Sequence, residues 1–215
     1  MRADDLSGMR RDYERGPFQE SDLAPTWLEQ FHDWLIEAAE IQREPNAMVL
    51  ASADADGRPS ARTVLLKRVD ESGFTFYTNL GSRKGRELAA NQRASLVFPW
   101  VDSERQVVVV GTAATVDEAQ ADEYFASRPY RSSIGAWASQ QSSVLPDRAA
   151  LERAWAEAER RFPASGAVPR PPGWGGFCVA PETVEFWQGR RDRLHDRLRY
   201  RDTGAGGWVI ERLAP

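Results

Sequence analysis

One stretch in the first half of the chain alternates between short runs rich in β-branched and aromatic residues and four-residue segments that end in glycine. The runs 47–52, 60–69 and 74–78 predict strands. The segments 54–57 and 70–73 predict the turns between them. Connections this short join antiparallel neighbours, because parallel strands need a crossover of a dozen or more residues. The stretch therefore predicts an antiparallel meander, and it constrains the fold more than any other part of the chain.

The rest of the chain continues this pattern and adds helices. Further strands are predicted at 94–99, 106–116, 177–180, 183–188, 198–202 and 208–213. Helices are predicted at 26–41, 117–127 and 147–162, with a short helix that follows the turn at 81–85 and ends near residue 91. Loops are predicted at 134–143 and 163–176. The G-x-G-x-x-G motif and the βαβ alternation of a Rossmann fold are both absent from the sequence. Hairpin-linked strands with helices set apart predict an α+β fold on an antiparallel barrel or sandwich.

Composition excludes several classes of protein. The 215 residues carry a net charge of −4, which gives no support to non-specific nucleic-acid binding. With Cys178 as the only cysteine and two histidines, neither an intrachain disulfide nor a Cys/His metal site is expected. No apolar run is long enough to span a membrane and the N-terminus lacks a signal core, so we expect a cytoplasmic protein. We expect residues 21–215 to form a single domain and residues 1–20 a flexible N-terminal segment.

Two basic segments are candidate anion sites. Glu185–Gly189 predicts the end of a strand with two large aromatic residues, and the next eight residues hold four arginines and His195. Rings beside guanidinium groups suit a flat anionic ligand, although a solvated charged loop explains these residues equally well. Gly81–Gly85 precedes a predicted helix, whose free N–H groups suit a phosphate, and Arg83 and Lys84 add positive charge. An ordinary basic loop is the alternative there.

Two further sets of residues predict phosphate contacts. Arg62 and Lys67 are five residues apart in one predicted strand, so we expect them on opposite faces, where they suit two different anions. Tyr124 and Arg128 share one face of a predicted helix, and Ser132 follows them closely. Two hydroxyl groups and a guanidinium group can converge on one phosphate.

Eight segments of the chain carry a resemblance to a known family: Arg62–Lys67, Phe76–Asn79, Ser82–Lys84, Glu104–Val107, Trp174–Gly176, Glu185–Gly189, Arg193–Arg197 and Arg212–Pro215. In this order they resemble the motifs of the pyridoxine/pyridoxamine 5′-phosphate oxidase family. Each segment is weak alone, but together they are highly specific and cover the chain from Met9 to Pro215.

The resemblance implies a split β-barrel that binds FMN, with peripheral helices, and a homodimer with FMN at the subunit interface. It implies oxidation of pyridoxamine 5′-phosphate and pyridoxine 5′-phosphate to pyridoxal 5′-phosphate, in vitamin B6 biosynthesis and salvage. O2 would be the electron acceptor and H2O2 a product. Neither a nucleic acid nor a membrane is implied as a partner.

The resemblance also implies roles for individual residues. The FMN-binding residues would be Arg62, Thr63, Val64, Leu65, Leu66, Lys67, Tyr77, Thr78, Arg83, Lys84, Gln106, Gln141, Ser142, Trp187 and Arg197. The substrate-binding residues would be Arg10, Tyr13, Lys67, Tyr124, Arg128, Ser132, Arg193, Leu194 and His195. Arg193 and His195 would be the catalytic residues, and Arg10 and Tyr13 would close over the substrate.

One departure and two alternatives stand beside this interpretation. After Arg128 and Pro129 the family often has a Ser-Gln pair, whereas this chain has Ser132 and Ser133, which affects only a neighbouring contact. One alternative is another split-barrel flavoprotein, such as a flavin reductase-like or nicotinamide-using enzyme; the intact Arg193–His195 segment argues against it. The other is a non-catalytic pyridoxal-phosphate carrier or flavin-binding module, which O2 consumption with pyridoxamine 5′-phosphate would distinguish from an enzyme.

Overall fold

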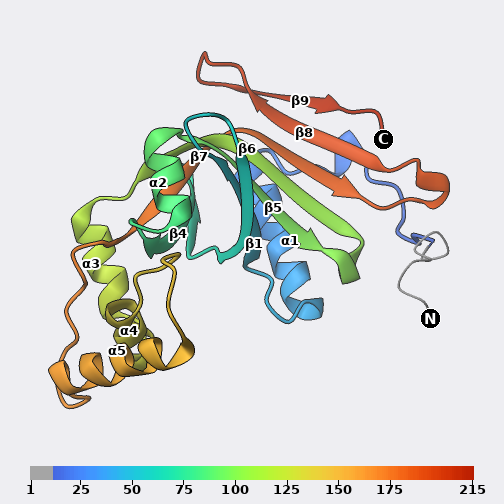
Figure 1. Ribbon diagram of the computed structural model, residues 1–215. Helices are drawn as coiled ribbons and strands as arrows, with labels where there is room; N and C mark the ends of the chain where they lie inside the picture. The colour runs from blue at the N-terminus through green and yellow to red at the C-terminus, as the bar shows by residue number, and fades with distance from the viewer. Residues whose placement is uncertain (1–11) are drawn as a thin grey trace. The chain divides into compact units, whose positions relative to one another are not determined.

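The computed structural model describes residues 12–215 and contains one nine-stranded sheet with five α-helices in that part of the chain. The strands are β1 Ala47–Ala53, β2 Pro59–Leu65, β3 Arg68–Asp70, β4 Gly73–Asn79, β5 Arg93–Trp100, β6 Arg105–Thr115, β7 Trp174–Gln188, β8 Asp196–Asp202 and β9 Trp208–Arg212. The helices are α1 Trp27–Ile41, α2 Arg83–Ala90, α3 Glu118–Ala126, α4 Tyr130–Ala138 and α5 Arg148–Arg161 (Figure 1). Short 3₁₀ turns lie at Glu20–Asp22, Val101–Ser103 and Arg191–Arg193.

The strand order is β2-β1-β5-β6-β7-β4-β3, and β8 pairs with β7 and β9. The pairs β3–β4, β4–β7, β7–β8 and β8–β9 are antiparallel. The predicted α+β fold on an antiparallel sheet is therefore confirmed. The continuous meander predicted from the strands at 47–52, 60–69 and 74–78 was wrong, because β1–β2 and β3–β4 lie at opposite ends of the strand order.

The chain divides into two compact units, each assembled from separate segments. The terminal unit comprises the chain up to Ala47 together with Leu96–Val110 and Glu182–Pro215. The central unit comprises Met48–Ser95 and Gly111–Pro181. This division does not test the expectation of a single domain over 21–215, which stays a prediction.

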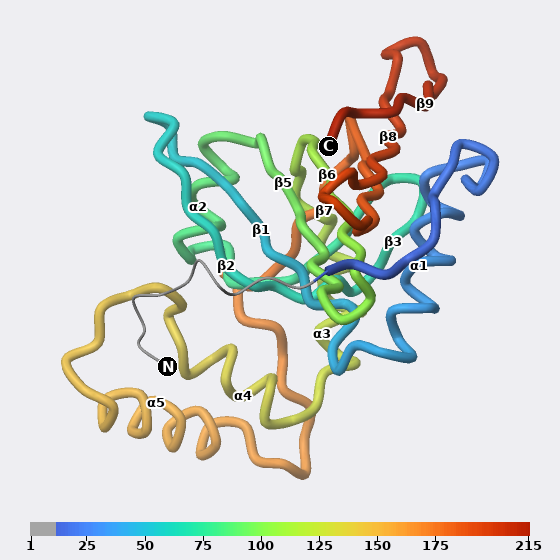
Figure 2. The backbone as a smooth tube through the Cα atoms, turned by 90° about the vertical axis from the view of Figure 1, so that its right-hand side faces the viewer, coloured from blue at the N-terminus to red at the C-terminus, as the bar shows by residue number. Residues whose placement is uncertain are grey.

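The central unit is built around the pairing of β4 with the first half of β7, in which Phe76 lies opposite Phe177. Both rings are buried and stack with their centroids 5.9 Å apart. Helices α4 and α5 of this unit pack against each other (Figure 2). At the start of α2, a Cβ on Gly85 would lie 2.1 Å from the carbonyl oxygen of Leu80. Only glycine permits this close approach, which fixes the N-terminal end of α2.

The terminal unit is built on α1, whose buried face confirms the predicted helical spacing. Its core includes Phe31, which contacts Phe98 with ring centroids 4.9 Å apart, and Trp34, which contacts Phe186 at 5.1 Å. The N-cap is the expected capping box, in which the Thr26 hydroxyl accepts from the backbone N–H of Glu29. Burial of these rings, worth about 2–3 kcal/mol each, anchors the helix.

Three local predictions were wrong. The loop predicted at 134–143 is helical in its first part, because α4 covers Tyr130–Ala138. The helix starts directly after Pro129, and nine residues show too few turns for the helical period to be visible. The strand predicted at 60–69 is two strands, because β2 ends at Leu65 and β3 begins at Arg68. The loop predicted at 163–176 ends early, since Trp174 and the glycines after it pair with β4 as the start of β7.

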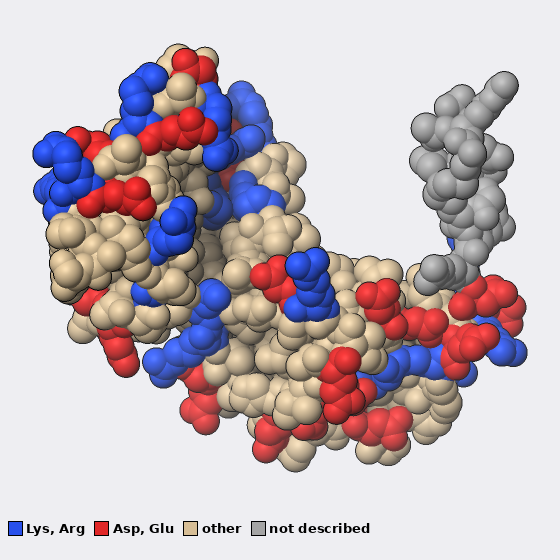
Figure 3. Space-filling view, turned by 90° about the horizontal axis from the view of Figure 1, so that it is seen from below, with Lys and Arg blue, Asp and Glu red and all other residues tan. Residues whose placement is uncertain are grey.

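None of the helices among residues 12–215 has both the length and the apolar character to cross a membrane. The same residues contain no group of three or more His, Cys, Asp or Glu side chains placed to hold a metal ion. On the face drawn in Figure 3, Lys and Arg residues are intermixed with Asp and Glu residues, in keeping with the small net charge of −4.

Candidate functional site

A cavity of about 590 Å³ in the central unit is the candidate site. Its volume lies within the range of small-molecule sites. Residues from five parts of the chain line it: Ser60–Leu65 with Lys67, Tyr77 with Thr78, Arg83 with Lys84, Tyr124 with Arg128, and Gln141 with Ser142. These include most of the predicted cofactor residues of this unit; Leu66 is buried and does not line the cavity.

Lys84, at the start of α2, is a buried cation held by oxygen atoms. Its Nζ donates to Gln141 Oε1 at 2.9 Å, to Thr78 Oγ1 at 3.1 Å and to Ser82 Oγ at 3.4 Å. Burial, and then the charge of Arg62, lower the pKa of Lys84 to about 8, although Glu87 acts in the opposite direction. An anion entering the cavity would stabilise the charged ammonium group.

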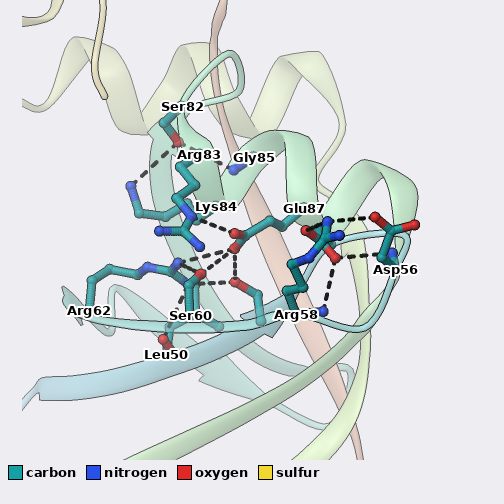
Figure 4. Close-up of polar contacts among 12 residues, drawn as sticks. Leu50, Asp56, Arg58, Ser60, Arg62, Ser82, Arg83, Lys84, Gly85 and Glu87 are labelled. Atoms are coloured by element: carbon teal, nitrogen blue, oxygen red, sulfur yellow. Dashed lines mark hydrogen bonds and ion pairs between the residues drawn. The ribbon is translucent and has the colours of Figure 1, made fainter. Parts of the chain in front are cut away.

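Arg62 and Arg83 share one buried carboxylate, that of Glu87 (Figure 4). Arg62 Nη2 donates to Glu87 Oε2 at 3.1 Å and Arg83 Nε donates to Glu87 Oε1 at 2.7 Å. Arg62 also donates to the hydroxyl groups of Ser52 and Ser60. Three cationic side chains therefore meet at the N-terminus of α2, the arrangement that suits a phosphate.

A second group of side chains faces the same cavity around an aromatic stack. The rings of Tyr77 and Tyr124 are 4.0 Å apart and inclined by 10°, and Trp174 lies parallel to Tyr77 at 5.5 Å. The Arg128 guanidinium carbon lies 4.9 Å from the centroid of Trp174, and Arg128 Nη2 donates to the Ser132 carbonyl oxygen at 2.7 Å. Arg128 Nε is buried and has no hydrogen-bond partner among the described residues.

The remaining predicted substrate residues of the central unit lie nearby. Lys67 is exposed and lines the large cavity. Ser132 lines a smaller cavity of about 330 Å³, which shares Tyr77 and Arg128 with the large one. The structure therefore brings both expected phosphate groups of this unit to adjoining cavities.

The expectation that Arg62 and Lys67 lie on opposite faces of one strand was wrong. The strand β2 ends at Leu65, so the alternation of side chains does not extend to Lys67. Both side chains line the same cavity.

In the terminal unit, Tyr13, Trp187 and His195 form a ring cluster. The Tyr13 ring meets those of Trp187 and His195 edge-on, at 5.6 and 5.4 Å, and the Trp187 and His195 centroids are 4.7 Å apart. His195 Nδ1 accepts from the backbone N–H of Arg190 at 3.1 Å, so the proton of the neutral ring is on Nε2. Burial, and then the charge of Arg193, lower the pKa of His195, which keeps the ring neutral at pH 7.

The other predicted residues of the terminal unit are placed as follows. Arg197 makes a two-pronged ion pair with Glu185 at 2.7 and 3.0 Å, which raises the pKa of Arg197. Arg193 has a left-handed backbone with φ of 61°, as has Asp192 at 57°. Gln106 is half-buried on β6, and Leu194 is 70% exposed.

Arg10 lies outside the described residues. The roles expected of all these side chains stay predictions. From the sequence, no role was assigned to Glu87 or to Trp174. Glu87 lies four residues after Arg83 on α2, and this spacing is the one signal that pointed to their ion pair.

Two family models match the chain. One, described as pyridoxamine 5′-phosphate oxidase, matches residues 35–162. The chain belongs to the pyridoxamine 5′-phosphate oxidase family. The second model matches residues 174–215 and is described as the pyridoxine 5′-phosphate oxidase C-terminal dimerisation region.

Sequence identity to known members supports the assignment of the chain to this oxidase family. The chain is 57% identical over 197 residues to the pyridoxine/pyridoxamine 5′-phosphate oxidase of Salinispora arenicola, covering 91% of this chain and 89% of the relative. It is 55% identical to that of Nocardioides sp., covering 98% of each. The solved structure of PhzG from Burkholderia lata 383, in complex with tetrahydrophenazine-1-carboxylic acid, superimposes with a TM-score of 0.85 at 35% identity, covering 91% of this chain and 95% of PhzG.

A more distant FMN-binding, oxidase-related protein of Nostoc punctiforme has a TM-score of 0.70 at 15% identity, covering 90% of this chain and all of that protein. These structural likenesses confirm the split-barrel fold.

Proposed function

We propose that the protein oxidises pyridoxamine 5′-phosphate and pyridoxine 5′-phosphate to pyridoxal 5′-phosphate, with FMN as cofactor and O2 as electron acceptor. The oxidase names of the relatives support the reaction. The observation that carries the proposal is the cavity of about 590 Å³, which two distinct groups of cationic side chains line. Two groups suit the two phosphate esters that FMN and the substrate bring.

The first group fits the phosphate of FMN. Arg62, Arg83 and Lys84 supply three positive charges at a helix N-terminus. A neighbouring phosphate dianion would stabilise the charged form of Lys84, whose pKa burial lowers to about 8. When bound, FMN would accept two electrons from the substrate and pass them to O2. Gln141 Oε1, which accepts from both Lys84 and Thr78, keeps the ammonium group directed at the cavity.

The second group fits the phosphate of the substrate. Arg128 offers its guanidinium group, and Tyr124, Ser132 and Lys67 add two hydroxyl groups and an ammonium group. Trp174 holds the Arg128 guanidinium by a cation–π contact. Fixing the phosphate end of a small rigid substrate orients its reacting carbon, which is an effect of proximity and orientation.

Arg193 and His195 are proposed to act at the reacting carbon. His195 is neutral and carries its proton on Nε2, so it can donate a hydrogen bond to the substrate oxygen or nitrogen. Arg193 adds a fixed positive charge. The amine substrate consumes one water and one O2 and gives aldehyde, ammonia and H2O2, whereas the alcohol substrate needs only O2.

We further propose that the enzyme is a cytoplasmic homodimer with FMN at the subunit interface. The match of residues 174–215 to a dimerisation region supports the dimer. Trp187 and Arg197 belong to this region and are the residues proposed to contact the flavin ring.

The likeness to PhzG supports a second candidate, oxidation of a reduced tricyclic aromatic acid. Arg128 can form a two-pronged pair with a carboxylate as well as with a phosphate. The two candidates make different demands, since only the first needs a phosphorylated substrate.

Anaerobic bleaching of the yellow, FMN-loaded protein tests the proposal. Pyridoxamine 5′-phosphate is expected to bleach the flavin absorbance, and readmitted O2 to restore it with formation of pyridoxal 5′-phosphate. Pyridoxamine without its phosphate is the matched control and is expected to react far more slowly. Bleaching by tetrahydrophenazine-1-carboxylic acid but not by pyridoxamine 5′-phosphate would favour the second candidate, and bleaching by neither would refute both.

A further inference from the structure

Glu87 is a buried carboxylate that stands behind the lining of the large cavity. It lies on α2, one turn after Arg83, and its side chain is 5% exposed. A buried charge is costly unless other groups pair with it. The partners of Glu87 therefore indicate why a carboxylate is placed here.

Its two oxygens accept hydrogen bonds from residues of three elements. Oε1 accepts from Arg83 Nε at 2.7 Å, and Oε2 accepts from Arg62 Nη2 at 3.1 Å. Oε2 also accepts from Ser52 Oγ on β1 at 2.6 Å and from Ser60 Oγ on β2 at 2.5 Å. One carboxylate thus joins α2 to two strands and binds both guanidinium groups (Figure 4).

These contacts keep the group charged. Burial alone would raise the pKa of Glu87, but hydrogen bonds from the two serines and the two arginines lower it to about 2. With Arg62, Arg83 and Lys84 also charged, the cluster has a net charge of +2. That charge matches a phosphate monoester dianion.

We propose that Glu87 is a positioning residue of the cofactor site, whose carboxylate fixes the guanidinium groups of Arg62 and Arg83 in the orientation that the FMN phosphate requires. The inference rests on the proposed function, because it takes FMN as the ligand of this cavity. A guanidinium group binds phosphate through a planar fork, so its orientation decides how many hydrogen bonds it makes. Glu87 makes no contact with the ligand itself; it acts through the two arginines.

Charge and orientation predict opposite effects when Glu87 is neutralised. Glu87→Gln removes a negative charge close to the phosphate, so electrostatics alone predicts tighter binding of FMN. An amide has only one acceptor oxygen, and its NH₂ group repels donors, so it cannot hold both guanidinium groups and both serines. If orientation dominates, FMN binds more weakly.

The test compares FMN with riboflavin, which lacks only the phosphate. The Kd of each flavin is measured by quenching of flavin fluorescence for the wild type, Glu87→Gln and the matched control Glu157→Gln. Glu157 is an exposed glutamate paired with Arg160 on α5. We expect Glu87→Gln to raise the Kd of FMN at least about tenfold, the loss of about one charge-assisted hydrogen bond, with riboflavin unchanged. The control is expected to match the wild type.

Several results would overturn the inference. Unchanged or tighter binding of FMN by Glu87→Gln means that orientation is not the role of the residue. An equal loss of affinity for FMN and riboflavin means that the residue only supports the fold.

If Glu87→Gln does not fold, Ser52→Ala removes one donor to the carboxylate from a buried residue outside the cavity lining. A smaller rise in the Kd of FMN alone is then expected, and no change overturns the inference. A wild-type protein that binds neither flavin, or both equally, instead refutes the proposed FMN phosphate site.

Discussion

The pKa of Lys84 predicts a specific pH dependence of FMN binding. In the flavin-free protein, burial and the charge of Arg62 lower this pKa to about 8. A phosphate dianion beside the ammonium group favours its charged form, so binding above pH 8 takes up a proton. The phosphate does not titrate in this range, because its second pKa is about 6.

The size of the effect follows from the pKa. With a pKa of about 8, about nine-tenths of the Lys84 side chains are charged at pH 7 and about one-tenth at pH 9. The Kd of FMN is therefore expected to rise about tenfold between pH 7 and pH 9. Fluorescence quenching at constant ionic strength measures it, with riboflavin as the ligand whose Kd should stay flat.

Lys84→Met is the matched variant. It should bind FMN more weakly at pH 7 and show no slope between pH 7 and pH 9. A flat Kd in the wild type, or the same slope in Lys84→Met, refutes the reasoning.

The same group gives a stability test with a fixed sign. The pKa of Lys84 is about 8 in the folded protein and 10.5 in the unfolded chain. Burying the charged ammonium group therefore lowers the free energy of unfolding, and below pH 8 the whole of this cost is present. This cost disappears as the pH rises from 8 to 10.5. The Tm of flavin-free wild type should therefore rise relative to that of Lys84→Met in this window.

Three further predictions concern other residues. Arg193→Ala should keep FMN but lose about 100-fold or more in kcat/KM, since orientation at the reacting carbon is lost; unchanged turnover would remove Arg193 from the mechanism. Trp174→Leu should raise the KM for pyridoxamine 5′-phosphate about fivefold through the lost cation–π contact with Arg128, with Trp174→Phe intermediate; equal KM values would refute this. Gly189→Ala would place a Cβ 2.6 Å from Tyr13 Cδ1, so Tyr13 must move and KM should rise, as steady-state kinetics can verify.

The fold was predictable where local signals were strong. The turns that end at Gly57 and Gly73 gave the neighbouring pairs β1–β2 and β3–β4, and the Thr26 capping box gave the start of α1. They did not give a continuous meander, because β2 and β3 lie at opposite ends of the strand order. Helix α4 escaped prediction because only two of its nine residues are buried, the polar Ser133 and the apolar Ile134, so its sequence shows no apolar face.

The candidate site was predictable residue by residue only through the resemblance to the family. Spacing alone placed Arg62 and Lys67 on opposite faces, because no turn residue in the sequence marks the end of β2 at Leu65. Glu87 was not predictable as a functional residue, because an acidic residue four positions after an arginine is typical of any exposed helix. Its burial between β1, β2 and α2 is a tertiary property.

The backbone at Asp192 and Arg193 has a consequence for engineering. Two successive residues with side chains occupy the left-handed region, each at a cost of about 1 kcal/mol or more. A glycine in place of Asp192 would relieve part of this cost and raise the melting temperature. The glycine would also make the loop more flexible, so Arg193 would be held less firmly. The variant would then combine a higher melting temperature with a lower turnover rate.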